Sequence, residues 1–392
     1  MRTYRIIAIL VSLLLSLVVA EGTLRLIEKS QLGDRAIEGK LIDDPILGQK
    51  LAPYTQGHDA NGFRNASVPR QADMITLGDS QTWGVNANRE DSWPQQLSRI
   101  SGHNVYNMAL GGFGPVQYSV LTSQAISLSP KLIIVAVYLG NDIYDAYRMV
   151  YQHEKYRLLR DVKAPKDLAD DTVGVRAESF WNQEKEYHAN FGRGTVSGLS
   201  FWLREHLAIG RLLNRTGLWP GSADVDFEID RHWALNQPDH GIICENAAIK
   251  TVFTTAYRLE GLNLDEPRIA EGLRITKNLI GDMERQADAS KVRLLILLIP
   301  TKESAYAGVM SEKNDSNPTY AKLIEMEGRV RKEIVAECRT QNIDCLDTLA
   351  YLSEALRRGE AIYPTSTESH PNPRGYFVIA SAVNNNLGKL GF

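Results

Sequence analysis

Apolar positions along the chain follow two patterns. Runs of consecutive apolar, often β-branched residues are typical of strands buried on both faces of a parallel sheet, whereas apolar residues three or four positions apart are typical of helices. The run pattern predicts strands at 74–77, 104–110, 131–140, 292–300 and 342–347. The helical pattern occupies 93–100, 115–127, 268–288, 318–341 and 373–387. Strands that alternate with helices predict an α/β domain with a parallel central sheet over residues 71–392.

One block interrupts this alternation. Residues 144–263 contain no convincing buried strand and are rich in charged and aromatic residues. Because a structureless loop of this length is uncommon in a compact domain, we expect an insertion that forms a mainly helical cap. Its aromatic side chains could stack on sugars, although helix packing is their more ordinary role. They are Phe180, Trp181, Phe201, Trp202, Trp219 and Trp233.

The first 27 residues differ from the rest of the chain. Arg2 and Arg5 precede an uncharged apolar stretch that ends at Glu21. The apolar span is about 17 residues, or about 26 Å of helix, against a hydrocarbon core about 30 Å thick. We expect an N-terminal apolar helix that anchors the chain in the inner membrane. The alternatives are a cleaved signal peptide and a buried core helix, and the first of these also leads out of the cytoplasm.

Residues 28–70 are polar and turn-rich, and we interpret them as a tether plus an entry segment between the N-terminal helix and the domain. The chain of 392 residues is 43% hydrophobic and 23% charged, with a net charge of −3, so it has the composition of a globular protein and no basic stripe for nucleic acid. Cys338 and Cys345 are close enough in sequence for a local disulfide or for two buried thiols, and Cys244 has no obvious partner. No spacing of cysteine and histidine indicates a metal, and no cofactor is predicted.

Candidate chemistry is concentrated where the predicted strands end. Ser80 follows the first strand, Gly112 the second and Asn141 the third, while His370 precedes the last helix. Ligands of open α/β sheets bind at the carboxyl ends of the strands. Ser80 could be a nucleophile or a helix cap, and Gly112 could offer a backbone N–H or only a tight turn. Asn141 could donate its amide or form an Asx turn, and His370 could be a general base or a surface cap.

Taken together, these residues resemble the four blocks of the SGNH/GDSL hydrolase superfamily. The matching segments are GDSQTWG (78–84), NMALGGFG (107–114), LGND (139–142) and HPNPRGY (370–376). The resemblance covers residues 73–142 and 292–387 but not the insertion. It implies a flavodoxin-like parallel sheet sandwiched by helices. It also implies that Ser80 is the nucleophile and first oxyanion N–H, that Gly112 and Asn141 are the second and third oxyanion donors, and that His370 is the base.

The chain departs from the family at one position. The family usually has an aspartate three residues before this histidine, where this chain has Thr367. Glu368, two residues before His370, could instead orient the imidazole. The alternatives are a Ser80–His370 dyad oriented by a backbone carbonyl, and Glu368 as a solvated loop acid. The segment IPTKE (299–303) resembles one in alginate-acetylation proteins, so Lys302 or Glu303 could line the cleft, or could merely end a strand.

These observations predict an extracytoplasmic serine esterase that acts on acyl or acetyl groups of a glycan or lipid. The alternatives are an O-acetyltransferase of polysaccharide modification and a non-catalytic glycan-binding protein of the same fold. The expected partners are an acylated small-molecule or glycan substrate and the inner membrane, but not nucleic acid. The catalytic domain is expected on the periplasmic or extracellular side, and the oligomeric state stays open.

Overall fold

The computed structural model has a five-stranded parallel sheet at its centre, with the strand order β4-β3-β5-β8-β9. It describes residues 2–35, 41–55, 57–163, 166–194, 203, 206–215, 225–245, 249–310 and 317–392. The strands are β3 (Met74–Leu77), β4 (Val105–Asn107), β5 (Leu132–Tyr138), β8 (Arg293–Ile299) and β9 (Asp344–Asp347). The sheet confirms the predicted parallel α/β architecture, and the strands follow the flavodoxin-like doubly wound order.

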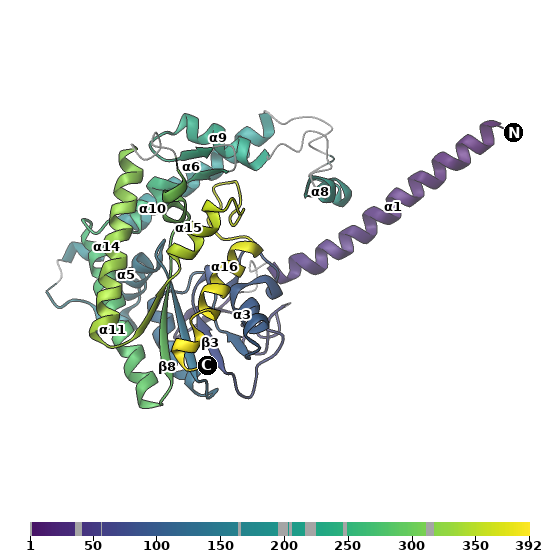
Figure 1. Cartoon of the computed structure of the whole chain (residues 1–392). Coiled ribbons are helices and arrows are strands. Elements are labelled where there is room, and N and C mark those ends of the chain that lie inside the picture. Colours follow the sequence, from purple (N-terminus) through teal and green to yellow (C-terminus); the bar gives the residue numbers. More distant parts are fainter. Residues whose placement is uncertain are drawn as a thin grey trace.

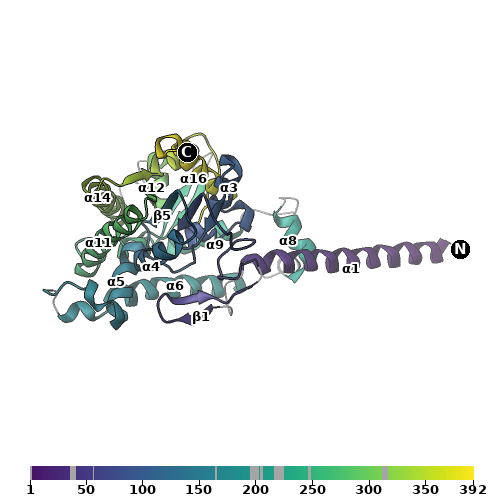
Figure 2. The same cartoon turned by 90° about the horizontal axis from the view of Figure 1, so that it is seen from below.

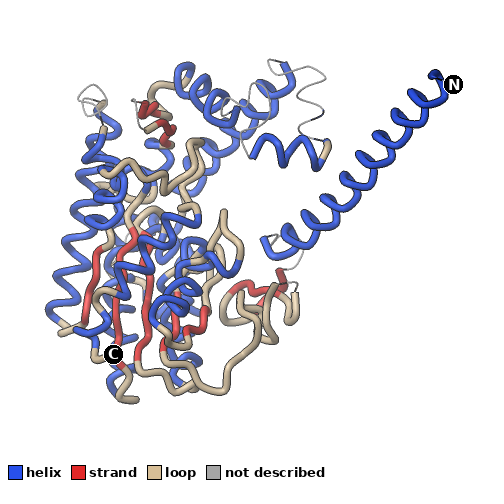
Figure 3. Tube along the Cα trace, turned by 45° about the vertical axis from the view of Figure 1, so that its right-hand side comes forward, coloured by secondary structure: helices blue, strands red, loops and turns tan. Residues whose placement is uncertain are grey.

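Helices cover both faces of this sheet (Figure 1 and Figure 3). On one face lie α4 (Pro115–Ile126), α11 (Pro267–Ala289) and α14 (Pro318–Thr340), and on the other lie α3 (Trp93–Ser101), α15 (Leu349–Arg357) and α16 (Pro373–Asn384). Successive side chains of a strand point to opposite faces. In β5, Ile133 and Val135 therefore join the first core while Leu132 and Ile134 join the second. Burial on both faces explains why this strand is apolar throughout.

The carboxyl ends of the strands meet at one edge because the strands are parallel. At this edge β3 leads into α2 (Ser80–Trp83), β5 into α5 (Asp142–Gln152) and β8 into α12 (Lys302–Tyr306). The turns after β3 and β5 need glycine. A Cβ atom at Gly78 would lie 2.2 Å from Thr82 Oγ1, and one at Gly140 would lie 2.4 Å from the ring of Tyr138. The glycines thus allow the sharp turns that place the polar residues after them at the edge of the sheet.

The described part of the insertion is mainly helical, and Figure 1 shows its helices gathered at one end of the molecule. It comprises the short 3₁₀ helices η2 (Glu154–Leu159) and η3 (Lys166–Ala169), and helices α6 (Thr172–Gly194), α8 (Ala208–Arg215), α9 (Val225–Asn236) and α10 (Thr255–Glu260). It also contains an antiparallel hairpin, β6 (Ile242–Glu245) and β7 (Lys250–Phe253), which the hydrophobic pattern did not reveal. Each strand has only four residues and includes exposed or half-exposed positions, so neither resembles the long apolar runs of the central sheet.

The aromatic residues of the insertion divide between packing and exposure. Trp233 is buried in a small core with Phe227 and Val252, which is the packing role. The Trp181 side chain is 47% exposed and lines a pocket. Phe201, Trp202 and Trp219 lie outside the described residues.

The N-terminal segment forms helix α1 (Arg2–Arg35), which extends away from the body of the protein (Figure 1 and Figure 2). Where α1 meets α8, the Glu21 carboxylate accepts hydrogen bonds from the backbone N–H groups of Ala208 and Ile209, at 2.9 and 3.1 Å. Among the described residues, no helix combines the length and the apolar character that crossing a membrane requires. The inner-membrane anchor stays a prediction.

The segment expected to be a tether is largely built into the domain. After α1 it forms an antiparallel hairpin of β1 (Leu41–Asp44) and β2 (Gly48–Leu51). Phe63 joins the hydrophobic core. The neighbouring Arg64 is fully buried and donates hydrogen bonds to the backbone carbonyls of Trp83, Gly84 and Ala87, just beyond the nucleophile candidate. This leading segment thus supports the short helix that carries Ser80.

None of the three cysteines forms a disulfide within the part of the chain that the structure describes. Cys338 lies at the end of α14 and Cys345 in β9, and a hydrogen bond between their thiols raises the pKa of Cys338 well above its usual range. The structure therefore has the reduced pair, not the disulfide.

Candidate active site

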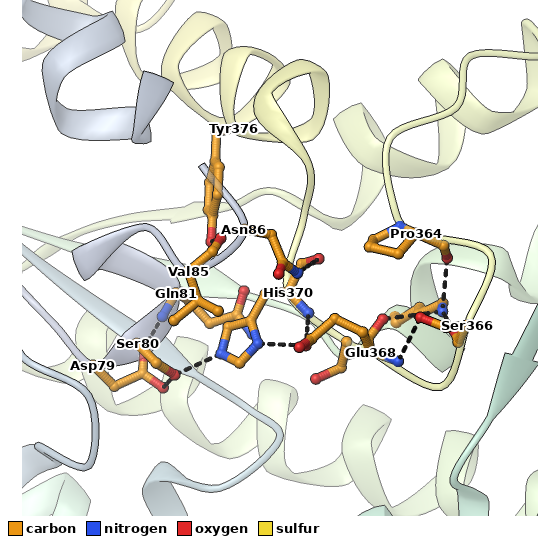
Figure 4. A network of polar contacts seen from close by, with 12 residues as sticks. Asp79, Ser80, Gln81, Val85, Asn86, Pro364, Ser366, Glu368, His370 and Tyr376 are labelled. Carbon is orange, nitrogen blue, oxygen red and sulfur yellow. Dashed lines mark hydrogen bonds and ion pairs between the residues drawn. The ribbon is translucent and has the colours of Figure 1, made fainter. Parts of the chain in front are cut away.

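Three side chains at the carboxyl edge of the sheet form a continuous series of hydrogen bonds (Figure 4). Ser80 Oγ lies 2.8 Å from His370 Nε2, and His370 Nδ1 lies 2.5 Å from Glu368 Oε1. The same Glu368 oxygen accepts a hydrogen bond from the backbone N–H of His370 at 2.9 Å. Ser80 is the first residue of α2, whereas the other two lie on the loop before α16. The fold thus brings together a hydroxyl, an imidazole and a carboxylate in the geometry of an activated nucleophile.

The Glu368 carboxylate is held in its charged form. Burial acts to raise its pKa, but the hydrogen bond and the charge of His370, together with the positive charge of Arg258, outweigh burial and lower the pKa to about 2. An ionised carboxylate at Nδ1 keeps the proton on that nitrogen and leaves Nε2 free to accept the proton of Ser80. Glu368 thus has the position of the acid that orients the imidazole in a catalytic triad.

Asp79, next to the nucleophile candidate, has a side chain with a structural role at the start of α2. It is fully buried, and its side chain accepts a hydrogen bond from the backbone N–H of Gln81 at 2.9 Å, which caps α2. Burial raises its pKa to about 6. The distance from Ser80 Oγ to Asp79 Oδ2 is 3.4 Å, longer than that to His370. Since α2 has only four residues, its dipole is smaller than that of a longer helix.

The two other predicted oxyanion donors differ in position. Asn141 lines the same pocket as Ser80 and His370, and its side-chain oxygen is buried without a hydrogen-bond partner in the described part of the chain. Its amide group is thus not committed to a structural cap. Gly112 has a φ of +82° and lines a neighbouring groove, not the pocket that holds Ser80. A positive φ at this position favours glycine, but the contribution of its N–H to an oxyanion stays a prediction.

The pocket around Ser80 has a volume of about 560 Å³ and lies between the sheet edge and the helical insertion. One wall contains Arg258 from α10, a residue that no sequence motif had indicated. Its guanidinium donates a hydrogen bond to Ser369 Oγ and lies over the rings of Tyr257 and Tyr138, at 5.1 and 5.8 Å from their centres. Arg258 thus places a positive charge beside the loop of Glu368 and His370.

Lys302, from the IPTKE segment, supports this loop from the inside. Lys302 and Glu303 are each only 1% exposed, and neither lines the pocket. The ammonium group of Lys302 donates hydrogen bonds to the backbone carbonyls of Ser366, Pro364 and Glu368, at 2.6, 3.1 and 3.1 Å. Burial lowers its pKa to about 8, so it stays mostly charged at neutral pH. Lys302 is therefore a positioning residue that holds the loop on which Glu368 and His370 lie.

Replacing this ammonium group should loosen the loop. In Lys302→Met the loop loses an ammonium donor, although the Thr251 hydroxyl still donates to the carbonyls of Pro364 and Ser366. We expect the free energy of unfolding to fall by about 3 kcal/mol. We also expect kcat for ester hydrolysis to fall by about 10- to 100-fold with a smaller change in KM, because a misplaced base costs rate more than binding. Chemical denaturation and steady-state kinetics test this, with the partly exposed Lys322→Met on α14 as the control. Full activity in the variant would show that the loop keeps its place without Lys302.

Comparisons with known proteins give structural similarity only. No protein-family profile and no curated protein match the chain. The chain is similar to a member of the lipolytic protein G-D-S-L family from Veillonella parvula, with 11% identity over 81% of this chain and 98% of that chain and a TM-score of 0.34. It is also similar to a GDSL-like lipase from Bacteroides thetaiotaomicron, with 11% identity over 81% and 87% of the two chains and a TM-score of 0.32. A third similar structure is a catalytic mutant of an acetylxylan esterase from Geobacillus stearothermophilus, with 11% identity over 82% and 94% and a TM-score of 0.36. At these identities the chemistry has to be argued from the residues of this chain.

Proposed function

We propose that the protein is a serine esterase that hydrolyses acyl or acetyl esters. The observation that carries the proposal is the series of contacts from Ser80 Oγ through the His370 imidazole to the Glu368 carboxylate, at 2.8 and 2.5 Å. The series ends at a pocket of about 560 Å³, a volume within the range of small-molecule sites. A helix cap alone would not need a histidine and a glutamate aligned behind the serine.

The reaction follows from this geometry in two steps. Ser80 Oγ attacks the ester carbonyl carbon while His370 Nε2 takes the hydroxyl proton, and the charged oxygen of the tetrahedral intermediate accepts hydrogen bonds from the Ser80 N–H and the Asn141 amide, with the Gly112 N–H as the predicted third donor. His370 then returns the proton to the leaving alcohol, which forms acyl-Ser80. Water attacks the acyl group with the same base assistance and releases the carboxylic acid. Glu368 stabilises the imidazolium in both steps.

The walls of the pocket support an acyl group carried by a glycan. Trp181 and Tyr257 line it, with their ring centres 6.3 Å apart, beside acidic and basic side chains that can exchange hydrogen bonds with hydroxyl groups. Such a mixture of aromatic faces and charges suits a sugar better than an aliphatic lipid chain. We also propose that the protein acts outside the cytoplasm, for which the support is the positively charged start of the chain and the apolar stretch that follows it.

A fluorophosphonate probe tests the nucleophile directly. We expect stoichiometric labelling of the full chain, with the adduct on the peptide that contains Ser80, and no labelling of Ser80→Ala. The matched control is Ser127→Ala, which removes an exposed hydroxyl at the end of α4 and should label like the wild type. Unlabelled wild-type protein would refute the esterase and favour the non-catalytic glycan-binding alternative.

The acyltransferase alternative uses the same acyl-Ser80 intermediate. It differs only in the molecule that takes the acyl group from Ser80, which is a sugar hydroxyl instead of water. Acetate release from a chromogenic acetyl ester should proceed without any added sugar if water is the acceptor. If an oligosaccharide accelerates turnover and becomes acetylated at the expense of free acetate, transfer replaces hydrolysis as the function.

A further inference from the structure

A second cluster of functional groups faces the same pocket from the insertion. Glu184 and His188 lie on α6, one helical turn apart on the same face, and Asp230 lies on α9. One carboxylate oxygen of each acid and one ring nitrogen of the histidine lie within 4.8 Å of one another. All three residues line the pocket that contains Ser80. None of them belongs to the ester-cleaving series described above.

The buried carboxylate of this cluster is only half satisfied. Asp230 is fully buried, and its Oδ2 accepts a hydrogen bond from the backbone N–H of Thr367 at 2.6 Å. Its Oδ1 lies 2.7 Å from His188 Nε2, but the orientation of the two groups makes no hydrogen bond, and neither atom has another partner within the described ranges. Both atoms are thus directed into one small space beside the Glu184 carboxylate, which is itself 8% exposed.

Two acidic side chains this close and this buried call for a positive charge. The imidazole of His188 supplies at most one charge for two carboxylates, and its side chain is 36% exposed. The only basic residue within two positions of the cluster on α6 is Lys185, which also lines the pocket and lies over the ring of Trp181. Arg258 on the pocket wall and the buried Lys302 also place positive charge near these two acids. The feature that fits an ion is therefore the convergence of three donor atoms within 4.8 Å of one another.

We propose that Glu184, His188 and Asp230 bind a divalent transition-metal ion, with Zn²⁺ as the best match. One imidazole nitrogen and two carboxylate oxygens form a donor set that Zn²⁺ accepts, at bond lengths of about 2.0–2.2 Å. Donor atoms around a tetrahedral ion with bonds of this length lie about 3.3–3.6 Å apart, so three atoms that lie within 4.8 Å of one another need only small rotamer changes to enclose it. The fourth position would face the pocket and take water or an oxygen atom of the substrate.

The position of the cluster gives the ion a role. Asp230 holds the backbone of Thr367, the residue directly before Glu368. An ion that fixes Asp230 to α6 would therefore fix both cap helices to the loop that carries the base. Any consequence of this fixed loop for the rate of hydrolysis rests on the proposed esterase function, whereas metal binding itself does not.

Calorimetric titration of the full chain with zinc chloride, after removal of metals with a chelator, tests the site. We expect one ion per chain, with the affinity at least 30-fold lower in His188→Ala and in Glu184→Gln. His153→Ala, which removes a half-buried imidazole outside the pocket, is the control and should bind like the wild type. Co²⁺ in place of Zn²⁺ should give the visible absorption of a tetrahedral site in the wild type and not in His188→Ala.

Two outcomes would overturn the proposal: no binding by the folded wild-type chain, or equal affinity in the wild type and both variants. Circular dichroism confirms that the variants fold, and both changed residues lie on a partly exposed helix. Ser80→Ala should still bind one Zn²⁺, and the chelated wild type should still react with the fluorophosphonate. These two measurements separate the failure of the metal site from the failure of the esterase.

Discussion

Ser80→Ala is expected to lower kcat for a chromogenic acetyl ester by about 10⁴- to 10⁶-fold while KM changes little. The alanine cannot form the acyl intermediate, and the residual rate comes from binding and from the oxyanion donors alone. KM is spared because the Ser80 hydroxyl is a small part of a pocket of about 560 Å³. Steady-state kinetics with highly purified protein measure the loss, and Ser127→Ala should keep the wild-type rate.

A double variant shows whether the residues act as one unit. In Ser80→Ala/His370→Ala, the second change should cost almost nothing further, because His370 serves the reaction only by taking the proton of Ser80 Oγ, 2.8 Å away. If the two losses multiplied, each residue would contribute independently, and the hydrogen-bonded series would not be the reacting unit.

Much of the fold and of the candidate site could be predicted because it depends on local pattern. The buried run of β5 contains no polar position, so its parallel pairing on both edges followed from residue types alone. The turns at Gly78 and Gly140 require glycine for steric reasons, which made the strand ends recognisable. A parallel sheet then places Ser80 and Asn141 at one edge, wherever they lie in the sequence.

The residues that escaped prediction lack a local signal. Arg258 and Asp230 act on the loop of His370 across more than a hundred residues of sequence, and their elements carry only an ordinary helical pattern. Lys302 was noticed, but its side chain is directed inward, toward carbonyls of a loop that sequence could not place.

The loop at 364–370 connects these observations. It is held from the core by Lys302, from α10 by Arg258 and from α9 by Asp230, and each of these contacts lies within a few residues of His370. Such support from three directions fixes the imidazole relative to Ser80 without requiring a long regular element. It also explains how an insertion so far from the sheet core in sequence can belong to the site.

Glu368→Gln is expected to lower kcat by about 10³- to 10⁴-fold, the scale known for replacing the triad acid of a serine protease by its amide. The amide can present its N–H to Nδ1, which favours the wrong tautomer, and it cannot stabilise the imidazolium. Because the pKa of Glu368 is lowered to about 2, its charge is constant over the working range, so the loss in Glu368→Gln should be of similar size at every pH at which the wild type is active.

The stability of the folded chain provides an independent check on the same residue. The unfolded pKa of a glutamate is about 4.3, so the unfolded chain binds more protons than the folded chain between pH about 4.3 and about 2. The stabilisation by Glu368 is thus complete above this interval and is lost as the pH falls through it, and Glu368→Gln should remove this part of the acid dependence. Glu354→Gln, which changes an exposed glutamate on α15, is the matched control for both kinetics and denaturation. If Glu368→Gln kept its activity within tenfold of the wild type, a backbone carbonyl would have to orient the ring, and the Ser80–His370 dyad would replace the triad.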